Sequence, residues 1–227
     1  MNKNNTFVLL ISIAVGITII TVISFFIVWL CFPTDTPKDS FKDALGFMGG
    51  IFGGLTTFGA AIVAVHLFND WKVQHNKQVI NNFGLQVYEQ FSNFEKDLSI
   101  YHQCLEQLDD LIDSYEWEVN STMLHTDNNL HYISNITNKM RELKISFNSL
   151  YSKFQSYSIV LGTLNEDYIR YNGYLDTFKD NNSFDDEIFI VRENLNTWYE
   201  NYNETLALTN QIRTSEIEKL LINLKAK

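Results

Sequence analysis

Two long apolar segments come first in the chain, and a longer region of amphipathic pattern follows them. Residues 7–32 and 44–69 each run for 26 positions without an acidic or basic charge. A helix of that length is about 39 Å long and the hydrocarbon core of a bilayer is about 30 Å thick, so each segment can span a membrane with some tilt. The pattern predicts that residues 1–70 form a two-helix transmembrane hairpin in the lipid bilayer.

The first apolar segment has two competing interpretations. A cleaved signal peptide is disfavoured because the run far exceeds the roughly 7 to 15 residues of a signal-peptide core, and no small-residue cleavage site follows it. Lipidation of Cys31 is disfavoured because Val28, Trp29 and Leu30, which precede it, are bulky. We therefore expect this segment to remain as a membrane span.

The connection between the spans predicts their orientation. Residues 33–43 contain both prolines of the chain, and so short a link makes the spans antiparallel, with both termini on one side. Lys3, Lys72 and Lys77 lie on that side and outnumber the two lysines of the link. The positive-inside rule then favours cytoplasmic N- and C-termini.

Small residues recur at helical spacing along the second span. Gly46, Gly50 and Gly54 form two overlapping GxxxG steps, which allow helix backbones to approach closely in lipid. The candidate packing positions are Gly46, Gly50, Gly53, Gly54, Thr57, Ala60 and Ala64. Two partners are open: the first span, which offers Ser12 and Gly16, or a second copy of the chain, which would make the protein a homo-oligomer.

One ionisable residue, His66, lies inside the apolar segments. An ionisable side chain at membrane depth is a candidate for gating or proton sensing. The alternative is a structural pair with Asp70, one helical turn later, close to the membrane boundary.

The remaining chain carries three series of apolar residues at steps of three and four. These series predict helices over residues 71–119, 129–179 and 184–226, with polar breaks at about 120–128 and 180–183. The second series crosses Gly162 in phase, which favours one long helix there, and Ser183 is a plausible N-cap for the third. Short breaks between long helices predict an antiparallel three-helix bundle in residues 71–227 without strands, so the fold class is all-α.

The first of these helices follows the second span without a proline or a turn cluster. The sequence therefore predicts one continuous helix from the membrane into the bundle, with Gly84 as its one candidate hinge.

Composition argues against several functions. After residue 70 there are three glycines and no proline, so the glycine-rich loops of nucleotide and acyl-transfer sites cannot be built, and we expect neither an enzyme nor a bound cofactor. Residues 71–227 have a net charge of −9, from 14 basic and 23 acidic side chains, which disfavours nucleic acid as a partner. The acidic run at 89–118 is either a solvated helix face or a docking surface for a basic protein.

Two histidine groups are weak metal candidates. His102 and Glu106 lie one helical turn apart, and His125, Asp127 and His131 cluster at a predicted break between helices. Neither group supplies a third and fourth ligand at fixed spacing, so we expect no metal site.

The stretch from Gly46 to Gln78 resembles the second span and juxtamembrane helix of small two-span bacterial membrane proteins, among them phage abortive-infection proteins. The similarity covers the glycines at the start of the span, the apolar run after them and the polar exit with Trp71, Lys72, Gln74 and Gln78. The resemblance implies an inner-membrane location and an output of membrane perturbation during phage infection.

Together these features predict a bacterial inner-membrane protein that self-associates through its second span, with a cytoplasmic helical bundle that senses a signal or binds a protein partner. The alternative from a different functional class is a passive membrane anchor or scaffold that positions another protein.

Overall fold

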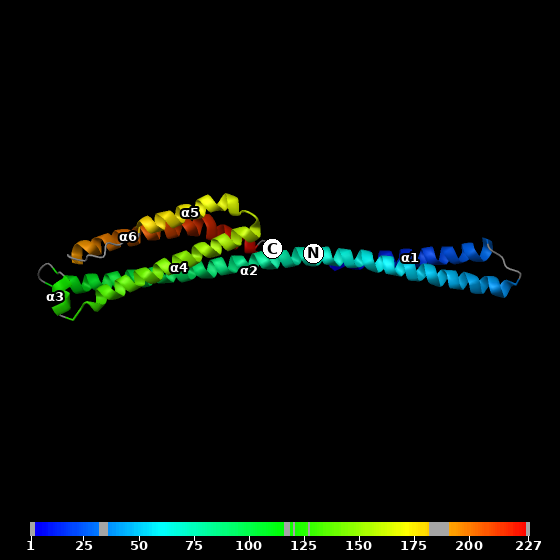
Figure 1. The fold of residues 1–227 in the computed structure, drawn as a ribbon, viewed down its shortest axis with the longest axis horizontal. Coiled ribbons are helices and arrows are strands. Elements are labelled where there is room, and N and C mark those ends of the chain that lie inside the picture. The colour runs from blue at the N-terminus through cyan, green and yellow to red at the C-terminus, as the bar shows by residue number, and fades with distance from the viewer. Residues whose placement is uncertain are drawn as a thin grey trace. The chain divides into compact units, whose positions relative to one another are not determined.

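The computed structural model describes residues 3–31, 36–115, 119, 121–126, 128–181 and 191–225. These residues form helices and no strand, which confirms the all-α prediction (Figure 1). The helices are α1 (Lys3–Cys31), α2 (Pro37–Asp113), α3 (Ser121–Thr126), α4 (His131–Leu161), α5 (Leu164–Asn181), α6 (Val191–Ile212), the π-helix η1 (Arg213–Ile217) and α7 (Glu218–Lys225).

The chain divides into two compact units, Met1–Asn76 and Lys77–Lys227, and α2 contributes to both. The boundary lies close to the predicted one after residue 70. We refer to these parts as unit 1 and unit 2.

Within the described residues, two helices are long and apolar enough to cross a membrane, and unit 1 holds their apolar stretches: α1 and the N-terminal part of α2. Most of their apolar side chains are exposed in the isolated chain, as expected of surfaces that face lipid.

The link between these helices is shorter than predicted. We expected residues 33–43 to form it, but α2 already begins at Pro37. Thr36 caps the helix by accepting a hydrogen bond from the Asp39 backbone N–H at 3.4 Å. Proline is favoured at the first helical position because its missing N–H would have no partner inside the helix there.

Unit 2 corrects the prediction of one helix over residues 129–179. The chain turns at Gly162, whose φ of 77° is left-handed, and the backbone N–H groups of Gly162 and Thr163 donate to Ile159 and Ser158. This arrangement is a Schellman helix end. Only two residues separate α4 from α5. The spacing of apolar residues by three and four therefore continues from one helix into the next, although the two helices run in opposite directions.

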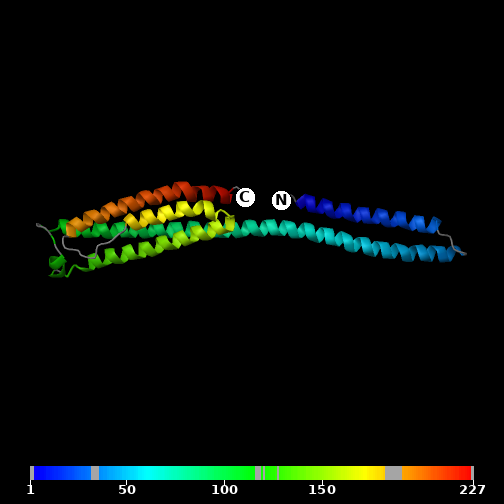
Figure 2. The ribbon, with the colours of Figure 1, turned by 45° about the horizontal axis from the view of Figure 1, so that its top comes forward.

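Ring contacts establish the direction of α5 along α4. Phe147 stacks on Phe178 at 4.0 Å between ring centroids. Phe154, seven residues later in α4, stacks on Tyr171, seven residues earlier in α5, at 4.8 Å. The bundle therefore contains four long helical segments rather than the predicted three, with α5 antiparallel to both α4 and α6 (Figure 2).

The predicted apolar series form the core of unit 2. All seven members on α2 from Phe91 to Ile112 are at most 3% exposed: Phe91, Phe94, Leu98, Tyr101, Leu105, Leu108 and Ile112. They pack with residues of α4, α5, α6 and α7 in one continuous core. Burial at alternating steps of three and four is the arrangement that the sequence predicts for helix packing.

Several predicted boundaries move. The first bundle helix ends at Asp113 rather than 119, and the predicted break at 120–128 contains α3. The predicted N-cap, Ser183, lies outside the described residues, and α6 is described from Val191. α2 continues through Gly84 without a break, as predicted for a continuous helix.

Candidate functional sites

One face of α2 packs against α1 in unit 1. The α2 positions that are buried or half-buried repeat at steps of three and four: Ser40, Ala44, Met48, Ile51, Leu55, Gly59, Val63 and His66. Gly59 lies close against α1, because a Cβ at this position would be 2.9 Å from side-chain atoms of both Ile13 and Ile17. Phe41 supports the contact near the loop, with its ring 5.8 Å from that of Phe25.

The predicted small-residue positions lie on the other side of α2. Gly46, Gly50, Gly53, Gly54, Thr57, Ala60 and Ala64 are all exposed in the isolated chain. At 100° per residue their average direction is about 180° from the face that meets α1. Ala60 and Ala64 lie at the edge of this set, since they line a groove shared with Ile13 and Ile17 of α1.

No side chain covers the glycines of this face. A Cβ on Gly46, Gly49, Gly50, Gly53 or Gly54 would meet no atom within 4 Å outside the local helix backbone. Gly16 of α1, a predicted counterpart, also has no neighbour within 4 Å, and the Ser12 hydroxyl donates to the Val8 carbonyl of its own helix at 2.8 Å. We name Gly46, Gly49, Gly50, Gly53 and Gly54 the glycine face.

His66 lies at the α1-facing edge of α2 and beside Asp70. Its Nε2 atom is 3.6 Å from Asp70 Oδ2, and 42% of its side chain is exposed. This geometry is that of the structural pair considered from the sequence. A gating role for His66 stays a prediction.

The described residues contain no group of three His, Cys, Asp or Glu side chains that could hold a metal. His102 lies 3.7 Å from Glu106 and stacks on Tyr202 at 4.3 Å, so its ring packs between α2 and α6. His131 stacks on Tyr132 at 4.2 Å, while Asp127 of the second predicted group lies outside the described residues.

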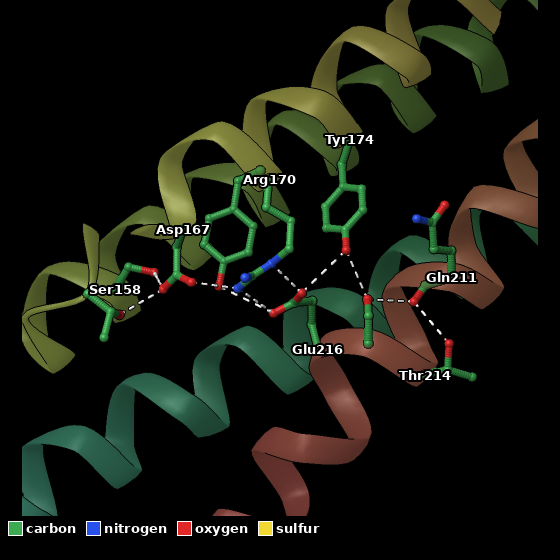
Figure 3. Close-up of polar contacts among 10 residues, drawn as sticks. Ser158, Asp167, Arg170, Tyr174, Gln211, Thr214 and Glu216 are labelled. Carbon is green, nitrogen blue, oxygen red and sulfur yellow. Dashed lines mark hydrogen bonds and ion pairs between the residues drawn. The ribbon is translucent and has the colours of Figure 1, made fainter. Parts of the chain in front are cut away.

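A polar cluster that the sequence did not predict joins α4, α5 and η1 (Figure 3). At its centre Asp167 is 9% exposed and accepts hydrogen bonds from Ser158 at 2.9 Å and Thr163 at 2.7 Å, with an ion pair to Arg170 at 2.6 Å. Burial by itself would raise the pKa of Asp167, but the hydroxyl donors and the Arg170 charge outweigh it and hold this pKa below its ordinary value.

The same Arg170 reaches the π-helix. Its Nε forms an ion pair with Glu216 Oε1 at 2.6 Å, and its Nη2 donates to Glu216 Oε2 at 3.1 Å. The Tyr174 hydroxyl lies 3.3 Å from Glu216 Oε1 and 2.9 Å from Ser215 Oγ. Burial raises the pKa of Tyr174, and it raises that of neighbouring Tyr171 to about 12, so both phenols stay protonated donors at neutral pH. The carboxylates of Asp167 and Glu216 thus each have several hydrogen-bond or ion-pair partners.

This arrangement favours a structural role for the polar cluster over catalysis. Arg170 is shared by two carboxylates, and no serine, cysteine or lysine nucleophile stands beside a histidine base there. Little in the sequence indicates this cluster, because Asp167 and Arg170 look like exposed residues of one helix and Glu216 is 46 residues away from Arg170. The one local signal was Thr163, which precedes α5 where a capping side chain is favoured.

Arginines of α6 and η1 cover part of the acidic face of α2. Arg192 pairs with Asp113 and lies 4.0 Å from Asp109, and Arg213 pairs with Glu95. These acidic residues therefore have partners within the chain, a third possibility besides the solvated face and the basic protein partner.

No family model, curated protein or solved structure matches the chain.

Proposed function

We propose that the protein is a two-span protein of the bacterial inner membrane that self-associates through the glycine face of α2. The observation that carries this proposal is that the glycine face is uncovered, while α1 packs on the opposite side of the same helix. If the glycines served the packing of α1 on α2, the side chains of α1 would cover the glycine face. Here Gly59 is the one glycine of the second apolar segment at which a Cβ would meet α1.

The physics of the bilayer supports a second copy as the occupant. Lipid tails are as apolar as leucine, so helices associate in a membrane through close packing rather than through the hydrophobic effect. Glycines without covering side chains permit this close approach. Thr57, next to them, already donates its hydroxyl to the Gly53 carbonyl at 2.9 Å and so brings no unsatisfied polar group to the interface.

We further propose that both termini are cytoplasmic and that unit 2 is the part that senses a signal or binds a protein. The lysine distribution supports this orientation. The resemblance of residues 46–78 to phage abortive-infection membrane proteins supports membrane perturbation during infection as the output.

Self-association is tested with two differently tagged copies expressed in one bacterium. Gly50→Leu with Gly54→Leu should reduce co-purification of the two tags by about tenfold or more, because the leucines keep the backbones apart. Insertion should be unchanged, since leucine favours the membrane. Growth inhibition caused by expression should fall together with co-purification.

The matched control is Phe58→Leu with Val65→Leu, two side chains that are 67% and 62% exposed at the flank of the glycine face. This control should associate as the wild type does. Gly59→Ala serves as a second comparison, because it strains the contact with α1 and leaves the glycine face intact. If the Gly50 and Gly54 double variant still co-purifies fully, the anchor or scaffold function becomes the better account.

A further inference from the structure

The last helix of unit 2 is not a regular α-helix. α6 passes into the five-residue π-helix η1, which α7 follows, and we name η1 with α7, residues 213–225, the C-terminal arm. A π turn holds one more residue than an α turn, is rare and is frequent at functional sites. It also has an α-helical alternative, in which every later residue is rotated by about 100° around the axis.

Contacts from outside the arm hold the π turn in place. Glu216, within η1, forms an ion pair with Arg170 at 2.6 Å, and its neighbour Ser215 is hydrogen-bonded to Tyr174 at 2.9 Å. These side chains come from α5, so the polar cluster fixes which residues of the π turn face the bundle (Figure 3). With this register Ile217 and Leu220 are 2% and 4% exposed.

The end of the arm docks where α2 lacks a side chain. A Cβ on Gly84 would lie 3.4 Å from Leu224 Cδ2 and 3.5 Å from Tyr157 Cε2. The missing Cβ therefore gives Leu224 its place beside α2. In the α-helical register Leu220 and Leu224 would both turn away from this position.

Packing beneath the arm is incomplete. A partly open cavity of about 210 Å³ lies beside the ion pair of Arg170 and Glu216, and Tyr157, Lys219 and Leu220 also line it. Such a gap means that the arm loses fewer contacts on release than a fully packed helix would.

We propose that the C-terminal arm is a releasable strap: the contact of Arg170 and Tyr174 with Glu216 holds it in the docked register, and its release uncovers the apolar surface of α2 and α4 around Gly84 and Tyr157. Two discrete helical registers give this strap two states rather than a continuous range. The strap does not depend on self-association in the membrane, because all of its contacts lie within unit 2.

Hydrogen exchange of the full chain in detergent, read by mass spectrometry, tests the strap. Glu216→Gln should speed exchange over residues 218–225 by about tenfold, because it removes the charge from the ion pair with Arg170. Exchange in α4 and in residues 87–108 of α2 should not change. Glu200→Gln, an exposed residue of α6, is the matched control and should leave the arm protected.

A second pair of variants leaves the polar side chains intact. Gly84→Leu should release the arm, since the new side chain occupies the place of Leu224, whereas Gly84→Ala makes only ordinary contacts and should keep it docked. The strap is refuted if neither Glu216→Gln nor Gly84→Leu changes exchange in residues 218–225. It is equally refuted if exchange rises by the same factor in every helix of unit 2, since the arm would then open only with the whole bundle.

Discussion

At the scale of single residues, the glycines of this chain meet three different requirements. Gly59 permits the close approach of α1, Gly84 leaves room for Leu224, and Gly162 adopts a left-handed φ of 77° that ends a helix. Gly50 and Gly54 meet none of these within one chain, since nothing lies within 4 Å of the positions where their Cβ atoms would be. The sequence could show that glycines are abundant in the second span, but which of them pack inside the hairpin follows only from the side that α1 covers.

Asp167 gives a residue-scale prediction on the pH dependence of stability. Its pKa is lowered in the folded state, so on acidification the unfolded state takes up the proton first. The wild-type free energy of unfolding should therefore fall as the pH drops below about 4, and Asp167→Asn should show a shallower fall. Urea unfolding at several pH values measures this. Asp176→Asn, an exposed residue on the same helix, should keep the wild-type slope, and equal slopes for the two variants would contradict the role of Asp167.

At the scale of elements, the apolar pattern predicted the long helices well, but it missed the turn at Gly162 and misplaced the boundaries at 33–43 and 113–128. Most predicted core positions of α2, α4 and α6 are buried, because packing is encoded by the spacing of large apolar side chains. In the second series Leu161 and Tyr168, on either side of the turn, are instead 41% and 50% exposed. The turn at Gly162 was missed because it is so short that the apolar phase does not reset. Glycine at that position was a real stop signal, and the pattern on both sides outweighed it.

Gly162 and Gly173 give a pair of predictions with opposite signs. Gly162→Ala should lower the free energy of unfolding by about 1 kcal/mol, because alanine strains the left-handed backbone. Gly173→Ala should raise it by up to about 1 kcal/mol, since Gly173 lies inside α5 and its Cβ would meet nothing within 4 Å. Thermal unfolding followed by circular dichroism checks both, and a stabilising Gly162→Ala would contradict the observed helix end.

At the scale of the whole molecule, the division into an apolar N-terminal unit and an amphipathic helical unit was visible from the distribution of charge and apolar residues. The polar cluster was not, because Ser158, Arg170 and Glu216 meet only through tertiary packing of three elements. The same is true of the arginines that cover the acidic face of α2. Contacts between polar residues far apart in the chain produce no regular spacing of residue types, so a single sequence does not indicate them.

The division predicts that residues 77–227, produced without the spans, are soluble and strongly helical. The core residues of this unit pack on one another and need no lipid contact. Far-ultraviolet circular dichroism measures the helix content. A spectrum dominated by strand or coil would contradict the independence of unit 2.

The most direct test of the central claim is a cysteine scan along α2 in native membranes, with Cys31 and Cys104 replaced by serine. If two copies meet through the glycine face, oxidation should give disulfide-linked dimers with cysteine at 46, 50, 53 or 57. Positions 44, 48, 55 and 59, which face α1, should give few. Equal crosslinking at all positions, or a maximum at the α1-facing ones, would contradict self-association through the glycine face.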